Sequence, residues 1–563
     1  MSLALIVAIG AALRIPLVAL AADSYRLTES FNIEEVENIR LSTGMLHKHD
    51  PNPHAFEYPS LFYYLSLIVE APLRAPSHDA WRAYLVGVRG LSLLFGLGII
   101  WNVALLARRL AGDLAGLLAA ALILFDRTMI DISTLAKPNA AQVFFVLAAF
   151  LAFLSLAHRP RVSTASFAAA LLAFATASKW LGALALAPLA LAPLLSSPST
   201  APRGLRRLLD TLRAGLRAPV APWQVALPVA TFVVLFLAMV PFSILSPREF
   251  GFGLAQTFTA QSVHQRAVSI WTPLAFAIQS LGPLGALFAG LGLLAALARL
   301  ARWEATRAER GLLLVLGWAL AYGALLILVF VKLPSYIDLW IPFLAILAGV
   351  ALAGPRGRFG SPVLRASAVA AALIAGLLSN GGYAAARALT ARVADTRISA
   401  GQWMDAHAAA GDSILADLGA FVPDRLTHVR WNGWGSPPRT VYDENATWGW
   451  DPVWPEWYGG HRRLSFENVK WKDPMMLLAE RPRWIVTSDA WSQIRARPSH
   501  ASETAAPEYD ATLADGSAGY ALCARFDPAP APANPWKLLA ALRPPRSAVQ
   551  YGGPDLRIYE RVR

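Results

Sequence analysis

Long apolar stretches dominate this chain and limit its fold more than any other feature. About 20 consecutive, mostly apolar residues are enough for a helix to cross the hydrocarbon core of a bilayer. The stretches that approach this length cover residues 2–22, 83–107, 111–127, 138–157, 164–178, 181–196, 223–245, 271–298, 311–331, 335–354 and 363–383. Three of them, 111–127, 164–178 and 181–196, are short for a span. The pattern predicts an α-helical polytopic membrane protein with about eleven transmembrane helices.

The composition agrees with a membrane protein and excludes other classes. Hydrophobic residues make up 56% of the 563 residues and charged residues only 15%, whereas a soluble domain carries roughly 25% charged residues. This balance excludes a disordered chain, a wholly soluble enzyme and a fibrous repeat. The single cysteine, Cys523, excludes an intramolecular disulfide and a cysteine-based metal cluster. Residues 1–22 lack a basic n-region and a clear cleavage site, so we expect them to remain as the first span.

Basic residues predict the orientation. The net charge is +13, and with seven lysines among 50 basic residues the other 43 are arginines. Arginines cluster in five loops between spans, at 108–109, 159–161, 203–217, 299–310 and 356–365. All five lie on the side of the N-terminus if the apolar segment 58–73 is an interfacial helix that does not cross. The positive-inside rule therefore predicts a cytoplasmic N-terminus and an external C-terminus, in the plasma (inner) membrane of a bacterium, and not nucleic-acid binding.

Two parts of the chain are then expected outside the membrane. The first outer loop covers residues 23–82, and a polar tail that holds eleven of the nineteen tryptophans covers 384–563. A strand-like run at Trp484–Ser488 and a helix-like run near Ile398–Ala410 predict a small α/β domain in this tail. We therefore expect a transmembrane domain over 1–383 and an extracytoplasmic, periplasmic α/β domain over 384–563.

Ionisable residues of mixed type gather at the predicted outer face. The acids of the first loop include Glu29, Glu34, Glu35, Glu37, Asp50 and Glu57. Three of the seven lysines, Lys137, Lys179 and Lys332, lie at outer ends of spans. Ionisable groups near the hydrocarbon boundary are expensive, so a cluster at one face indicates a functional site. The alternative is a solvated loop, with lysines that extend towards the interface.

Several short motifs follow one another along the chain, each occurring once. The first loop has the acidic pair Glu34-Glu35, then Gly44, then the run Phe56-Glu57-Tyr58-Pro59. Later motifs are Ala136-Lys137-Pro138-Asn139, Ser178-Lys179-Trp180-Leu181-Gly182, Gln261-Ser262-Val263-His264-Gln265-Arg266, Lys332-Leu333-Pro334-Ser335-Tyr336 and Asp395-Thr396-Arg397. Together they resemble the C-type glycosyltransferase superfamily, and most closely its family 39 of protein O-mannosyltransferases and aminoarabinose transferases of lipid A. The resemblance covers about residues 1–420.

This resemblance implies an enzyme that moves a hexose or pentose from a polyprenyl-phosphate carrier to an acceptor hydroxyl on the outer face. The acceptor would be a lipid, a glycan or a protein. Glu34 takes the place of the family's catalytic aspartate, so we expect it to be the general base, with Glu35 as the alternative. A partly desolvated carboxylate can be tuned towards neutral pH for this role. The competing interpretation is that both acids only stabilise a helix N-terminus.

The leaving lipid phosphate needs compensation of its charge, and lysines can supply it as point charges. We expect this role for Lys179 and Lys332, with Lys137 as a third candidate at the position of a family arginine. Asn139 stands where the family has an aspartate, and it can hydrogen-bond a substrate hydroxyl but cannot act as a base.

Two tyrosines fall in the same motifs. Tyr336 resembles a tyrosine at the mouth of the family's active site, and Tyr58 lies in the aromatic-Pro motif, so we expect both at the substrate site. The alternative for Tyr336 is an aromatic-belt residue.

A divalent metal ion is a further expectation of the resemblance. Glu57 and His264 match positions that bind such an ion in the lipid A-modifying relatives. Both are acceptable zinc ligands, but two are too few for a closed site, so water or phosphate would complete the shell. The alternative for His264 is a polar loop residue.

Two other classes of function compete with the enzyme. A transporter is expected to show broken helices, ionisable residues at mid-membrane and a paired repeat, whereas the charges lie at span ends and no repeat is visible. A non-catalytic scaffold descended from the enzymes is suggested by Glu34 and Asn139, which both replace aspartates.

Overall fold

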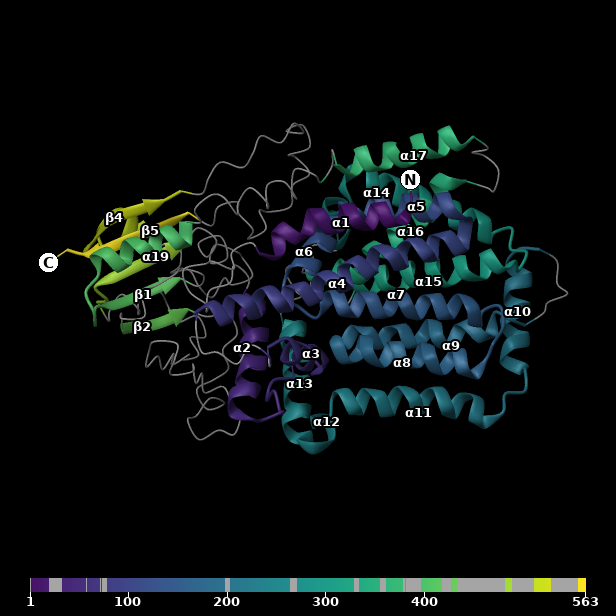
Figure 1. Ribbon diagram of the computed structural model, residues 1–563, viewed down its shortest axis with the longest axis horizontal. Helices are drawn as coiled ribbons and strands as arrows, with labels where there is room; N and C mark the ends of the chain where they lie inside the picture. Colours follow the sequence, from purple (N-terminus) through teal and green to yellow (C-terminus); the bar gives the residue numbers. More distant parts are fainter. Residues whose placement is uncertain are drawn as a thin grey trace. The chain divides into compact units, whose positions relative to one another are not determined.

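The chain divides into two compact units (Figure 1), described from a computed structural model. Unit 1 comprises Met1–Val18, Phe56–Ile68 and Gly87–Ala385, and unit 2 comprises Ala19–Ala55, Val69–Val86 and Ala386–Arg563. The structure describes residues 2–19, 33–56, 58–70, 72, 78–197, 203–263, 271–328, 334–354, 361–377, 380, 396–417, 427–432, 481–488, 511–527 and 555–562.

Helices form nearly all of the regular structure before the tail. In chain order they are α1 (Leu3–Val18), α2 (Ile33–Lys48), α3 (Leu61–Glu70), α4 (His78–Ala111), α5 (Asp113–Leu124), α6 (Arg127–Thr134), α7 (Asn139–Leu156), α8 (Val162–Ser178), the 3₁₀ helix η2 (Trp180–Ala185), α9 (Leu186–Leu194), α10 (Leu205–Arg217), α11 (Pro222–Met239), α12 (Phe242–Leu245), α13 (Pro247–Val263), α14 (Thr272–Leu300), α15 (Arg307–Leu328), the 3₁₀ helix η3 (Pro334–Leu339), α16 (Ile341–Ala353), α17 (Pro362–Gly376) and α19 (Thr396–His407).

The apolar helices confirm the polytopic membrane fold. In the described part of the chain, six segments are long and apolar enough to cross a membrane, namely Ala83–Ala111, Asn139–Leu156, Pro222–Met239, Thr272–Leu300, Arg307–Leu328 and Tyr336–Ala353. Each of the eleven predicted stretches contains a helix. Helix α3 has ten residues and rises only about 15 Å, half the thickness of the hydrocarbon core. Its length agrees with the expected interfacial helix better than with a span.

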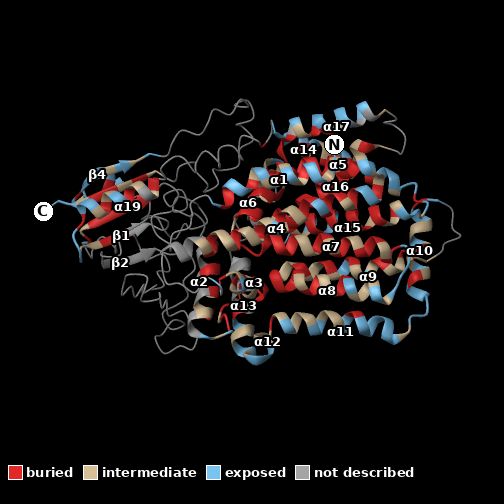
Figure 2. Ribbon diagram, in the orientation of Figure 1, coloured by how far each residue is buried: buried red, intermediate tan, exposed pale blue. Residues whose placement is uncertain are grey.

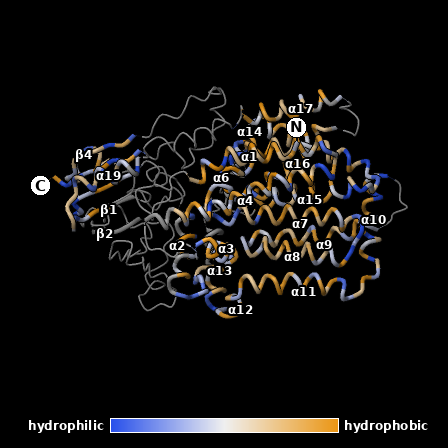
Figure 3. The backbone as a smooth tube through the Cα atoms, viewed as in Figure 1, coloured by the Kyte–Doolittle hydropathy of each residue, from blue (hydrophilic) through white to orange (hydrophobic). Residues whose placement is uncertain are grey.

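Burial separates the inner helices of unit 1 from the outer ones (Figure 2). The apolar segment Tyr336–Ala353, which includes α16, is 83% buried, and α7 is 72% buried, whereas α11 is only 6% buried. Helix α11 is nevertheless apolar along its length (Figure 3), so its exposed surface is suited to lipid and not to water. Helix α16 packs between α5 and α14, and α8 packs between α7 and α11.

Glycines allow the inner helices to approach closely. A Cβ on Gly292 of α14 would lie 2.6 Å from the carbonyl carbon and oxygen of Leu347 in α16, and a Cβ on Gly349 would lie 2.7 Å from the Ala115 carbonyl oxygen in α5. In lipid the hydrophobic effect does not drive helices together. Small residues at such crossings allow the close van der Waals packing that holds the helices together instead.

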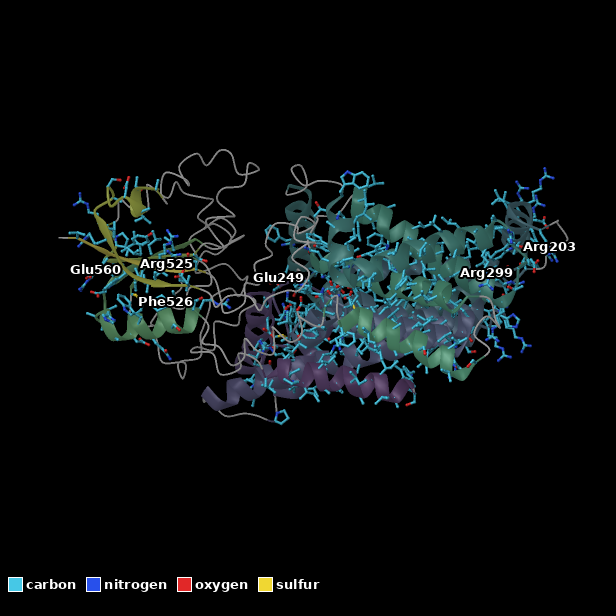
Figure 4. The ribbon with its side chains drawn as sticks, turned by 90° about the horizontal axis from the view of Figure 1, so that it is seen from above. Arg203, Glu249, Arg299, Arg525, Phe526 and Glu560 are labelled. Carbon is cyan, nitrogen blue, oxygen red and sulfur yellow. The ribbon has the colours of Figure 1, made fainter. Side chains whose placement is uncertain are left out.

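Arginine-bearing loops meet at one end of unit 1. Arg310 donates to the Ala157 carbonyl at 3.1 Å, and Arg203 pairs with Glu304 at 3.0 Å. Arg203 and Arg299 lie at the opposite end of the unit from Glu249 (Figure 4). Four of the five arginine clusters therefore share an end, while most of the fifth, 356–365, lies outside the described residues.

Helix α1 runs antiparallel to α4. Near the C-terminal end of α1, the Val18 carbonyl accepts a hydrogen bond from Arg89 at 3.2 Å. Further towards the N-terminus, Gly10 approaches the Ile100 side chain. The N-terminal end of α1 therefore points towards the arginine end, as expected if segment 58–73 does not cross. The side of the membrane that this end faces remains a prediction.

Segments between the predicted spans are not all loops. Helices α6, α10 and α13 lie there, and α10 coincides with the arginine run that we expected to be a loop. In α10, the exposed leucines Leu205, Leu209 and Leu216 alternate with arginines at helical spacing. This pattern is typical of a helix that lies in a membrane interface, and it is too polar to resemble a span.

The tail of unit 2 folds into a mixed sheet with a helix, which confirms its α/β character. The strands are β1 (Ser413–Asp417), β2 (Thr427–Asn432), β3 (Trp484–Ser488), β4 (Tyr520–Phe526) and β5 (Leu556–Arg561), in the order β2-β1-β3-β5-β4. Strand β1 pairs in parallel with β2 and β3, and β5 pairs antiparallel with β3 and β4. Ala400 and Met404 of α19 pack on one face, against Ile414 and Ile558.

Asp412 joins the start of β3 to the turn before β1. It accepts hydrogen bonds from Arg483 at 2.9 Å and from the Trp484 indole at 3.0 Å. Burial alone would raise the pKa of Asp412, but these two donors and the Ala409 amide outweigh it, so the pKa lies below its ordinary value.

Two glycines of α14 test the packing of this helix. We expect Gly292→Ala to destabilise the protein by about 1–3 kcal/mol, because the new methyl group would overlap the α16 backbone. Gly290→Ala is the matched control, since a Cβ there meets nothing within 4 Å. The apparent melting temperature in detergent should fall only for Gly292→Ala. Equal behaviour of the two variants would contradict the close crossing of α14 and α16.

Candidate active site

Lys179 occupies a sharp change of direction at the end of α8. Its backbone is extended, with φ −156° and ψ 136°, and the chain then enters η2. Its carbonyl accepts hydrogen bonds from the Gly182 amide at 2.9 Å and from the Gln142 side chain at 3.1 Å. A Cβ on Gly182 would lie 2.5 Å from the backbone of Ala175. The Lys-x-x-Gly spacing thus has a physical reason, because only glycine fits where η2 returns against α8.

The ammonium group of Lys179 lies among aromatic rings. The residue is 6% exposed, and its Nζ lies 5.7 Å from the ring centroid of Tyr58 and 5.3 Å from that of Tyr336. Cation–π attraction of this kind is strongest where the cation is desolvated. The two rings therefore help to hold a charged group at the end of a span.

Asp338 is the acidic residue near Lys179, and the sequence analysis did not predict it as a site residue. The residue is 1% exposed. Its Oδ2 accepts from the Asn139 side-chain amide at 2.6 Å, and its Oδ1 accepts from the Leu339 backbone amide at 2.7 Å. Lys179 and, more weakly, Lys137 interact electrostatically with its carboxyl group. An ionisable residue inside the predicted span 335–354 was the signal that could have identified it.

Lys137 and Asn139 enter the cluster from the turn before α7. Lys137 is 9% exposed, its amide donates to the Leu135 carbonyl at 2.8 Å, and Ser92 donates to its carbonyl at 3.5 Å. Pro138 precedes the helix, and Asn139 is its first residue. Four separate segments of unit 1 thus bring together Tyr58, Lys137, Asn139, Lys179 and Tyr336 around Asp338.

The other predicted site residues lie in α2 or outside the residues that the structure describes. Lys332, Glu57 and His264 lie outside the described residues. Glu34 lies in α2 of unit 2, where only its backbone is described, and Glu35 in the same helix is fully buried. Over the described ranges there is no group of three or more His, Cys, Asp or Glu that could hold a metal ion. The metal ligands and the catalytic base remain predictions.

Helix α2 is tied to the end of α3 by a buried carboxyl group. Ser42 of α2 donates to Glu70 Oε1 at 2.8 Å, and Glu70 is fully buried. Burial raises the pKa of Glu70 to about 8, although the hydrogen bond from Ser42 opposes this shift. The helix that carries both candidate bases therefore rests on an acid that is largely protonated at neutral pH.

Solved structures share this fold. The oligosaccharyltransferase of Archaeoglobus fulgidus in the apo form aligns with a TM-score of 0.51 and 14% identity, covering 100% of this chain and 88% of that chain. The same enzyme, tethered through a disulfide to an acceptor peptide with the NVT sequon, gives 0.52 and 13%, covering 99% and 88%. ArnT from Cupriavidus metallidurans bound to undecaprenyl phosphate gives 0.48 and 22%, covering 71% and 72%. At TM-scores above 0.5, the two oligosaccharyltransferase structures show that this chain shares their fold.

One segment of the chain also matches a family model. Residues 83–223 match the model of the dolichyl-phosphate-mannose-protein mannosyltransferase family. This segment contains Lys137, Asn139 and Lys179. No curated protein matches the chain. The chain is thus a polytopic membrane protein whose residues 83–223 match this mannosyltransferase family.

The raised pKa of Glu70 predicts a pH-dependent stability. The native state keeps a proton that the unfolded state releases above pH 4.5, so stability falls as the pH rises from about 4.5 to about 8. Glu70→Gln should remove this slope and stabilise the protein by roughly a few kcal/mol near pH 8.5. Apparent melting temperatures across this range would measure it. Glu304→Gln, at an exposed acid, is the control, and an unchanged slope in Glu70→Gln would refute the buried proton.

Proposed function

We propose that the protein is an integral-membrane glycosyltransferase that moves a sugar from a polyprenyl-phosphate carrier to an acceptor hydroxyl on the outer face of the membrane. The observation that carries this proposal is the ammonium group of Lys179, held at the end of a span beside Asp338 and between two tyrosine rings. A buried cation at the membrane boundary is expensive unless it has a function or a partner.

The chemistry of the leaving group fits this cluster. When the bond between the sugar C1 and the phosphate oxygen breaks, negative charge develops on the lipid phosphate. Lys179 is positioned to compensate it, and Lys137 and Lys332 are the further cations proposed for the same role. Because a phosphate leaves readily once its charge is compensated, no general acid is needed. The match of residues 83–223 to a family named for a dolichyl-phosphate sugar supports this donor class.

A carboxylate of α2 is the proposed general base. It removes the proton of the acceptor hydroxyl while the acceptor oxygen forms its bond to C1, and the proton stays on the carboxyl group. Glu34 is our first choice, and Glu35, which is fully buried, is the alternative. We propose a hexose or pentose as the sugar, and a lipid, glycan or protein as the acceptor.

The proposed setting is the plasma membrane, with the unit that carries the sheet on its outer side. The divalent ion proposed at Glu57 and His264 has no part in these steps. A scaffold without activity is the second candidate, because Asn139 supplies an amide where the family has a carboxylate.

Transfer assays with acidic-residue variants of α2 test the proposal. We expect Glu34→Gln to lower transfer from polyprenyl-phosphate hexose or pentose by about 10²–10⁴-fold, the usual contribution of a general base. If Glu35 is the base instead, Glu35→Gln shows that loss. Glu37→Gln, from the same helix, is the control and should stay near wild type.

The outcomes separate the candidates. Wild-type rates in both Glu34→Gln and Glu35→Gln would refute a base on α2. No transfer by the wild-type protein from any polyprenyl-phosphate sugar would favour the scaffold.

A further inference from the structure

The side-chain amide of Asn139 has a fixed orientation. Its Nδ2 donates to Asp338 Oδ2 at 2.6 Å, and a carboxylate can only accept, so the NH₂ group must face Asp338. The Oδ1 atom then faces away from that contact. Asn139 is 1% exposed, and among the described residues its Oδ1 accepts no hydrogen bond.

Gln142 repeats this arrangement one turn further along α7. Its Nε2 donates to the Lys179 backbone carbonyl at 3.1 Å, which again can only accept, and this contact fixes the amide. Its Oε1 is also buried and, within the described ranges, accepts no hydrogen bond. Residues three apart share a helix face. The start of α7 therefore presents two amide oxygens, held by partners that belong to the Lys179 and Asp338 cluster.

The parts of a lipid-linked sugar differ in what they can offer such oxygens. The isoprenoid chain has no hydrogen-bond donor, and an ionised phosphodiester only accepts. The sugar carries hydroxyl or amino groups, which donate. Buried acceptors without a donor are costly, so of these three parts only the sugar matches them.

We propose that Asn139 Oδ1 and Gln142 Oε1 form a subsite that accepts hydrogen bonds from the hydroxyl or amino groups of the donor sugar. Asp338 is the positioning residue that fixes the Asn139 amide. The inference rests on the proposed function, because it assumes a polyprenyl-phosphate sugar as donor.

The same geometry accounts for an amide at position 139. An aspartate there would place a second carboxylate 2.6 Å from Asp338, and like charges at that distance cannot both ionise. The acid of this region is therefore supplied by η3, and α7 contributes a neutral acceptor.

Binding measurements can isolate the sugar. We would compare the affinity for bare undecaprenyl phosphate with the affinity for undecaprenyl-phosphate mannose and undecaprenyl-phosphate arabinose, in nanodiscs and without an acceptor. We expect Asn139→Leu and Gln142→Leu each to lower the affinity for at least one glycosylated carrier by about tenfold, with the affinity for the bare carrier unchanged. Asn102→Leu, at another buried asparagine of unit 1, is the control and should change neither.

A charge exchange tests the positioning role of Asp338. Asn139→Asp should lose the sugar-dependent gain in affinity because two carboxylates then meet. Adding Asp338→Asn restores one donor and one acceptor across the same contact, so the double variant should regain most of the loss. A failure to regain it would overturn the role of Asp338.

The binding measurements distinguish failure of the sugar subsite from failure of the proposed function. If Asn139→Leu and Gln142→Leu lower both affinities equally, or lower neither, the sugar subsite is refuted while the proposed function stands. If the wild-type protein does not bind bare undecaprenyl phosphate, the proposed function itself fails.

Discussion

The burial of a charged lysine at the end of a transmembrane helix is the constraint on which the site depends. Lys179 cannot reach water freely at 6% exposure, so its charge must be compensated within the protein. Asp338 supplies the negative charge, and two tyrosine rings supply their electron-rich faces. The segment before α3, the start of η2 and η3 must therefore converge on one point, although they lie far apart along the chain.

The two ends of unit 1 are chemically different for the same physical reason. At one end, arginines and acids form loop contacts such as Arg203–Glu304, with exposed side chains. At the other end of α8, lysine, asparagine and aspartate are buried together. Exposed ion pairs of the first kind contribute little and suit topology. Buried groups of the second kind are retained only at a cost in desolvation, which is why they indicate a site.

The sequence was sufficient for the features that depend on local pattern. Apolar length predicted the spans. A strand-like run at Trp484–Ser488 predicted β3, and a helix-like run near Ile398–Ala410 predicted the helix that the structure has at Thr396–His407. The motifs predicted that Lys137, Asn139 and Lys179 belong to one site, and the structure brings these residues together. Helix α10 was missed because its arginines were read only as a topology signal, while its leucines also repeat at helical spacing.

Long-range pairing could not be predicted in the same way. Asn139 and Asp338 are 199 residues apart, and no periodicity connects them. The order β2-β1-β3-β5-β4 likewise depends on which strand edges meet in space, and not on the propensity of each strand.

The central claim is that Lys179 receives the phosphate of a lipid carrier, and binding of undecaprenyl phosphate to Lys179→Met tests it most directly. Methionine keeps an unbranched side chain of nearly the same length and removes the ammonium group. The control is Arg299→Met at the opposite end of unit 1. Our account predicts that affinity falls at least tenfold in Lys179→Met, equivalent to about 1.4 kcal/mol, and stays unchanged in Arg299→Met. Wild-type affinity in Lys179→Met would contradict it.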